Sequence, residues 1–361
     1  MKRKLCSRTA ALIVVYLACL ALANGANRGG LYSNSTLNYW QDRYSENILW
    51  NFNNSIWREL SSQEKYRLRN LDIVFPLIAP NGDPFAFYTL LGANSAQVNL
   101  PVFSIKFFDD LVISQSWLNA NGYDSQLPLD YVALLKYLSP ADFPGGRYQA
   151  PLLALKIPPS ALQNQSVDEI SQKILKSAIT WILLHEIGHA YYRHGEPTSA
   201  AIAQQQEIDA DNFATEILRR IGVAPIGMGV FFSAAVHWWP NRSDCPSNTA
   251  WMQAIRKSSH PITTDRLQNL ASAIWAYRQD FVRKEPDPQR ALAAIKVATQ
   301  TLSQMARFLA NEELQNTIRK KAELFGALPD PLGPRYPGQL PAAPSIPTVR
   351  IPDIITTICP Q

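Results

Sequence analysis

The sequence has few of the residues that usually cross-link chains or hold metal ions. Its 361 residues include 4 Cys and 5 His, and charged side chains make up 17%. A metal site built on cysteines needs closely spaced pairs, and the four cysteines are far apart. Any metal site is therefore expected to use histidine and carboxylate ligands.

Long hydrophobic runs are also scarce. The longest, Ala10–Ala23, is shorter than the ~20 residues that span a bilayer. It follows four basic residues and ends in Ala21-Leu22-Ala23, a small-x-small pattern typical of signal cleavage. We predict a signal peptide over 1–23, cleaved after Ala23, and a protein exported to the periplasm or the extracellular space. No stable membrane span is expected after cleavage. In an oxidising compartment the two remaining cysteines, Cys245 and Cys359, could pair.

The excess of positive charge is confined to that segment. Removing it takes away four basic residues, so 30 basic side chains face 29 acidic ones and the net charge falls from +5 to +1. A balanced charge gives no support for nucleic-acid binding.

Against this background, His185, Glu186 and His189 form the pattern H-E-x-x-H. On a helix, positions i and i+4 share a face, so both imidazoles can reach one metal ion. The intervening glutamate then acts on metal-bound water, as in zinc peptidases.

The flanking sequence predicts that this motif lies on a helix over about 167–194. Ser166 and Glu169 read as a capping box, and apolar residues recur at helical spacing up to the motif. The two histidines continue the apolar stripe and should face the interior. Gly188 lowers helix propensity, so a close backbone approach is expected there.

A third metal ligand is not supplied by the motif itself. His194 is rotated away from the ligand face, and the metzincin pattern fails because Tyr192 replaces the required glycine. Glu207 and Asp211 share a helical face 18 residues later, so Glu207 is the preferred ligand and Asp211 its supporting residue. Glu196 is the alternative ligand.

Together these motifs resemble the gluzincin metallopeptidases of the HtpX and CAAX-prenyl-protease type. A later Ser259-His260-Pro261 segment with Arg266 and Leu270 is similar to that family's His-Pro…Arg…Leu segment. The resemblance covers roughly 178–270. The family's membrane spans are missing, which favours soluble, exported members or a branch such as the phage-exclusion-type peptidases.

The resemblance implies a role for each matching residue. His185, His189 and Glu207 would bind zinc, and Glu186 would be the catalytic base. Asp211 would support the site, while His260 and Arg266 would lie beside it. His260 is also the first candidate for the second oxyanion donor. The alternative donors are Tyr191, Tyr192 and His237. The alternative roles of His260 are to cap the metal or simply to precede a helix.

The rest of the chain predicts an α+β, mainly helical, zincin-like fold with a small sheet beside the H-E-x-x-H helix. The expected strands cover 71–78, 85–91, 98–105 and 152–157, and the expected helices cover 107–118, 264–282 and 288–328. We divide the chain into a metallopeptidase domain (24–270), a helical extension (271–328) and a Pro-rich tail (329–361).

The predicted function is zinc-dependent hydrolysis of internal peptide bonds in a protein or peptide substrate, with envelope protein quality control as a setting implied by the resemblance. The alternative is a non-catalytic, zinc-stabilised binding or chaperone-like protein. Closed structural zinc sites have four protein ligands, whereas catalytic sites keep one position open.

Overall fold

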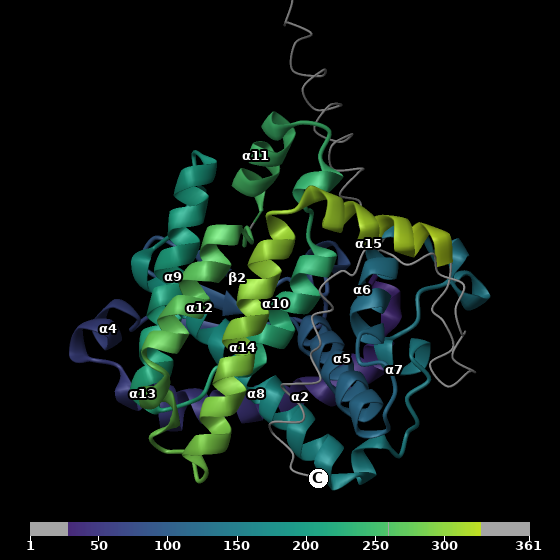
Figure 1. The fold of residues 1–361 in the computed structure, drawn as a ribbon. Coiled ribbons are helices and arrows are strands. Elements are labelled where there is room, and N and C mark those ends of the chain that lie inside the picture. Colours follow the sequence, from purple (N-terminus) through teal and green to yellow (C-terminus); the bar gives the residue numbers. More distant parts are fainter. Residues whose placement is uncertain (1–27, 259, 326–361) are drawn as a thin grey trace, which may run out of the picture.

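The computed structural model describes residues 28–258 and 260–325, which form a mainly helical α+β fold with one small sheet (Figure 1). The predicted signal peptide and Pro-rich tail lie outside the described residues. The α-helices are α2 (Asn34–Asn51), α3 (Trp57–Glu59), α4 (Ser62–Arg67), α5 (Val102–Ala120), α6 (Leu127–Tyr137), α7 (Pro151–Ala154), α8 (Gln165–Tyr192), α9 (Ala200–Ile221), α10 (Gly227–Trp238), α11 (Asn248–Lys257), α12 (Thr264–Ala276), α13 (Arg278–Val282), α14 (Pro288–Leu309) and α15 (Glu312–Phe325).

The sheet has three strands, β1 (Leu71–Val74), β2 (Tyr88–Leu91) and β3 (Ala96–Asn99), in the order β1-β3-β2. β3 is central and runs parallel to β1 and antiparallel to β2. Within this sheet β2 is therefore an edge strand. Both β2 and β3 pack against α8, so the small sheet lies beside the H-E-x-x-H helix as predicted.

Helix α8 is the centre of the fold, because α5, α9 and α10 also pack on it. Its second half is buried on all sides, including Trp181 at 2% exposure. The helix begins at Gln165 rather than near Val167, because Asn164 caps it by accepting hydrogen bonds from the next backbone amides. The predicted Ser166 cap was therefore wrong. The helix ends where Arg193 adopts a left-handed conformation with φ 56°.

Helix α9 crosses α8 at Gly188, where the sequence predicted a close backbone approach. A Cβ atom on Gly188 would lie 2.9 Å from Ala210 Cα and 3.2 Å from Phe213 Cβ. Ordinary carbon contacts are about 3.5–4.0 Å, so only glycine fits at this crossing. The close approach brings Glu207 and Asp211 of α9 over the two histidines of α8.

Two predicted strand assignments were wrong. The strand expected over 98–105 ends at Asn99, and α5 begins at Val102 directly after Pro101. The strand expected over 152–157 is instead the short helix α7, which begins with Pro151. Prolines suit the first positions of helices. The helix predicted over 107–118 lies within α5. Only the first residues of α5 were assigned to a strand, because they are buried on every face and show no helical periodicity.

The C-terminal helices are shorter than predicted. The helix expected over 264–282 is divided into α12 and α13, and the one expected over 288–328 into α14 and α15. Asp287 caps α14, as predicted. α14 packs on α10 and α12, so its apolar face completes the core around the site. The domain boundary at 270 stays a prediction.

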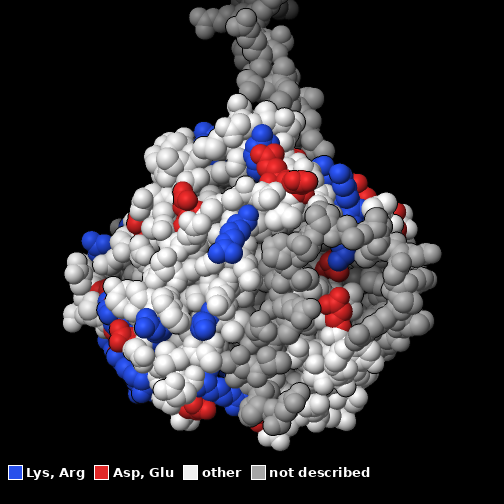
Figure 2. All heavy atoms as spheres, in the orientation of Figure 1, with Lys and Arg blue, Asp and Glu red and all other residues white. Residues whose placement is uncertain are grey.

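The described surface is mixed in charge. Basic and acidic side chains are interspersed over the face in Figure 2, much of which is uncharged. Among the described helices, none is both long and apolar enough to cross a bilayer. Cys245 is half-buried, and its predicted partner Cys359 lies outside the described residues.

Candidate metal centre

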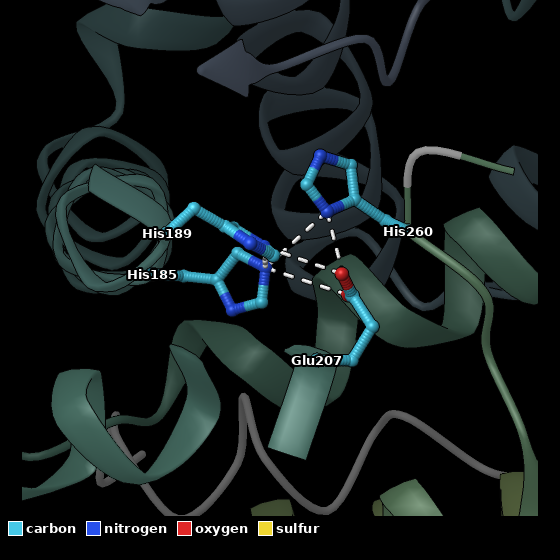
Figure 3. A group of neighbouring side chains, drawn as sticks. All are labelled: His185, His189, Glu207 and His260. Carbon is cyan, nitrogen blue, oxygen red and sulfur yellow. Dashed lines mark hydrogen bonds and ion pairs between the residues drawn. The ribbon is translucent and has the colours of Figure 1, made fainter. Parts of the chain in front are cut away.

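Four side chains from three segments converge in the interior (Figure 3). His185 and His189 come from α8 and Glu207 comes from α9. His260 comes from the linker between α11 and α12. All four are less than 10% exposed, and one ligand atom of each lies within 4.8 Å of the others. The structure thus brings together the three predicted ligands and the predicted catalytic histidine.

The spacing of the ligand atoms fits one small metal ion. His185 Nε2 lies 3.1 Å from His189 Nε2 and 3.3 Å from His260 Nδ1. Glu207 Oε1 lies 3.2 Å from His189 Nε2, and Glu207 Oε2 lies 3.4 Å from His260 Nδ1 and 3.5 Å from His185 Nε2. A tetrahedral zinc with bonds of about 2.0–2.1 Å separates its ligand atoms by about 3.3–3.4 Å. The group could therefore hold a metal ion.

His260 has the hydrogen-bonding pattern of a metal ligand. Its Nε2 lies 2.7 Å from the Phe87 carbonyl oxygen, which can accept its proton. In that tautomer Nδ1 carries the lone pair and faces His185 and Glu207. Histidine ligands usually donate their outer N–H in this manner, because it fixes the ring.

Asp211 and Arg266 support the ligands from behind. Asp211 Oδ1 lies 2.8 Å from His185 Nδ1, the outer nitrogen of that ring. Arg266 pairs with both Asp211 oxygens, at 2.8 and 2.9 Å, and with Glu207 Oε2 at 2.5 Å. The guanidinium is 3% exposed. Both predicted supporting residues therefore contact the ligands.

The charges of this buried group balance only if a cation binds or if two of the histidines are protonated. Glu186, Glu207 and Asp211 contribute three negative charges, and Arg266 contributes one positive charge. With neutral imidazoles the net charge is −2, and each of these groups is at most 3% exposed. Uncompensated buried charge is costly, and a divalent metal ion would restore neutrality.

The electrostatics keep the two glutamates ionised. Burial raises the pKa of Glu186, but His260, His189 and His185 outweigh it and bring the pKa down to about 2. Burial also opposes ionisation of Glu207, yet Arg266 and the histidines hold its pKa well below the usual range. Both carboxylates are therefore negative at neutral pH.

Thr89 of the edge strand β2 contacts Glu186. Its Oγ1 lies 2.8 Å from Glu186 Oε2 and 2.9 Å from the Glu186 carbonyl oxygen. The other carboxylate oxygen, Oε1, lies 3.1 Å from His260 Nε2. Sequence reasoning missed Thr89, because nothing local distinguishes it from any other strand threonine.

His194 has a closer relation to the site than the sequence suggested. It is not in the ligand group, as expected, but its Nδ1 lies 2.9 Å from His189 Nδ1. The left-handed turn at Arg193 brings it back over the helix end. On the other side its Nε2 lies 3.8 Å from Asp209. His194 therefore contacts the outer nitrogen of His189, as Asp211 does for His185.

The remaining candidates lie elsewhere. Glu196 is exposed and is not in the ligand group. Tyr192 is 44% exposed and stacks on His194, while Tyr191 packs against Phe213. His237 contacts the Ser233 carbonyl oxygen and stacks on Phe308, and it is not in the ligand group.

A small cavity of about 20 Å³ reaches the centre. His185, Glu186 and His260 line its polar side, and the rings of Phe87 and Trp181 are among its apolar walls. A water molecule needs roughly 10–15 Å³ by this measure. The cavity thus has the size of one water molecule beside Glu186 and the ligand group.

Comparison with known proteins gives one family. The family model described as Peptidase U49 matches residues 154–284. This range, little more than a third of the chain, contains every predicted site residue from His185 to Arg266. No curated protein and no solved structure matches the chain. The match supports a peptidase, and thus a protein or peptide substrate. The match identifies neither the metal nor the type of peptidase, so both depend on the residues of the site.

Proposed function

We propose that the protein is a zinc-dependent endopeptidase with a gluzincin-type centre and a zincin-like fold. The observation that carries this proposal is the ligand group itself. Its nitrogen and oxygen atoms lie within 4.8 Å of one another, and with neutral imidazoles the group and its supporting residues carry two uncompensated negative charges. Histidine and carboxylate ligands in this geometry suit zinc. The peptidase family match over the same residues supports the catalytic reading.

The side chains divide the chemistry among them. When bound, zinc supplies Lewis acidity for the scissile carbonyl and lowers the pKa of water. Glu186 accepts a proton from the attacking water and passes it to the leaving amine, while Thr89 fixes the carboxylate by a hydrogen bond. Arg266 and Asp211 hold the ligands in place.

His260 can complete the site in two ways. As an imidazolium it can donate a hydrogen bond to the developing oxyanion, or as a neutral ring its Nδ1 can occupy the fourth ligand position. X-ray absorption of the zinc-loaded protein distinguishes them, since it counts histidine ligands. Two histidines would give His260 the first role. Three would close the site and favour the non-catalytic alternative or a capped, latent enzyme.

Hydrolysis is tested with the pair Glu186→Gln and Glu196→Gln. Both replace a glutamate by its amide, but Glu196 is exposed and is not in the ligand group. We expect the wild type and Glu196→Gln to cleave unfolded casein, and a chelator to stop them. Glu186→Gln should bind zinc but lose at least ~100-fold in rate, the scale of general-base catalysis.

Two results would contradict the proposal. Equal cleavage by Glu186→Gln would remove the general base from the mechanism. Zinc bound stoichiometrically to a wild type that cleaves nothing would favour the non-catalytic alternative.

For the cellular setting, we propose that the protein is exported and acts in envelope protein quality control. Both are tested by locating the mature N-terminus and the protein in fractionated cells.

A further inference from the structure

His260 is held by residues that lie outside the helices of the other ligands. Its Nδ1 faces the ligand group, while its Nε2 lies 2.7 Å from the Phe87 carbonyl oxygen (Figure 3). The Trp239 ring lies beside it, with the ring centres 6.4 Å apart and the planes inclined by 31°. Phe87 directly precedes β2, and Trp239 directly follows α10. The position of the His260 ring therefore depends on two segments that are distant in the sequence.

Asp83 joins these two segments. Its Oδ1 accepts a hydrogen bond of 2.9 Å from the Phe85 backbone amide, in the loop that leads to Phe87. Its Oδ2 accepts one of 3.3 Å from Trp239 Nε1, across 156 positions of the chain. The Trp238 side chain is a further donor to this carboxylate. One half-buried side chain thus connects the loop before β2 to the end of α10.

The loop is packed closely enough to carry a shift at Asp83 to the Phe87 carbonyl. Phe85 is fully buried and packs edge-on against Trp239. The Ser104 hydroxyl, from α5, lies 3.3 Å from the Asp83 carbonyl oxygen. Because a close-packed interior transmits displacements rather than absorbing them, a loop loosened at Asp83 also moves at its other end.

The place of the Phe87 carbonyl matters for the general base as well. Glu186 Oε1 lies 3.1 Å from the same Nε2 of His260, farther than the 2.7 Å to the carbonyl oxygen. A hydrogen bond weakens with distance, so the Nε2 proton favours the carbonyl. Without that acceptor the proton would turn to Glu186 and occupy the carboxylate that acts on water.

We propose that Asp83 is a positioning residue of the metal centre, which holds the His260 ring through the Phe87 carbonyl and the Trp239 indole. The inference rests on the proposed peptidase function. Asp83 is not in the ligand group and acts through His260. It also lies outside residues 154–284, which the family model matches. The centre thus depends on a segment that the family match does not cover.

A double-mutant cycle between Asp83 and His260 tests this role. Asp83→Asn leaves one acceptor oxygen in place of two, so one of the two connected segments loses its hydrogen bond. Trp239→Phe removes the bond from the other end and keeps an aromatic ring. Asp72→Asn is the control, an exposed aspartate in β1. Each substitution is made in the wild type and in His260→Asn, with zinc content and melting temperature measured on the same samples.

In the wild-type background we expect kcat to fall about tenfold or more for Asp83→Asn and Trp239→Phe, the scale of residues that orient a metal site. It should stay unchanged for Asp72→Asn. In the His260→Asn background the first two substitutions should cost less than about twofold more, because the residue that they position is gone. Equal losses in both backgrounds, or full activity of His260→Asn, would overturn the positioning role and leave the peptidase standing.

A second measurement does not depend on activity. Proton–nitrogen correlation spectra of protein labelled in its histidine rings show which ring nitrogen carries a proton, and the His260→Asn spectrum identifies the His260 signals. We expect Asp83→Asn to shift the His260 signals and to leave those of His237 in place, and Asp72→Asn to shift neither. Unchanged His260 signals in Asp83→Asn would overturn the proposal. A zinc-loaded wild type that cleaves nothing would overturn the peptidase, and the spectra alone would then decide whether Asp83 holds the ring.

Discussion

The substitution Gly188→Ala tests whether the α8–α9 crossing sets the geometry of the metal centre. The added Cβ would lie 2.9 Å from Ala210 Cα and 3.1 Å from the Ala210 carbonyl oxygen. A carbon contact needs about 3.5–4.0 Å, so the helices must separate by roughly 0.6–1.1 Å. Metal–ligand distances tolerate only about 0.2 Å. Since Glu207 follows α9 and the histidines follow α8, the ligand group should open.

The expected effect on stability is modest, and the effect on metal binding is large. Alanine gains about 1 kcal/mol in helix propensity over glycine, while overpacking costs about 1–3 kcal/mol. The free energy of unfolding without metal should therefore fall by ~0–2 kcal/mol. Zinc affinity, measured by competition with a chromophoric chelator, should fall about 10-fold or more. Gly195→Ala is the control, because its Cβ would meet nothing within 4 Å. Unchanged zinc affinity in Gly188→Ala would refute the reasoning.

Two further predictions concern histidine support and a buried acid away from the centre. The substitution His194→Phe keeps a ring beside Tyr192 but removes the contact with His189 Nδ1. Zinc affinity should therefore fall about 10–100-fold. The control His237→Phe should bind zinc as the wild type does. Burial raises the pKa of Asp109 from 3.8 to about 6, against the pull of Lys106. A raised carboxyl pKa means that folding takes up a proton. The contribution of Asp109 to the free energy of unfolding is therefore fully present below about pH 4 and is lost as the pH rises through 6. The loss is on the order of 3 kcal/mol. Denaturant titrations measure the free energy of unfolding at pH 4 and at pH 7. The difference between the two values should be smaller for Asp109→Asn than for the wild type. An equal difference would exclude Asp109 as the source of this pH dependence.

The sequence predicted those parts of the centre that depend on helical spacing. His185, His189, Glu207 and Asp211 lie at i and i+4 on two helices, and a period of 3.6 places each pair on one face. Gly188 marked the crossing, because glycine inside a helix needs a packing reason. His260 and Arg266 came from the family resemblance and not from spacing.

What the sequence could not predict depends on contacts between distant segments. Thr89 reaches Glu186 across 97 positions, and a single threonine in a strand carries no signal of such a partner. His194 returns to His189 only because Arg193 adopts a left-handed conformation, which non-glycine residues seldom do. The strand predicted over 98–105 was wrong from Val102 onward, because the first turn of α5 is buried on every face and its residues show no helical period.

The charge deficit of the centre makes protons competitors of the metal. A net charge of −2 among Glu186, Glu207, Asp211 and Arg266 is neutralised equally by one divalent ion or by two protons on the histidines. Zinc loading near neutral pH should then expel close to two protons, which calorimetry in buffers of different ionisation enthalpy can count. Acidification would release the ion by the same exchange. The zinc concentration and the local pH would therefore act on the protein through one equilibrium, the exchange of zinc for protons at the ligand group.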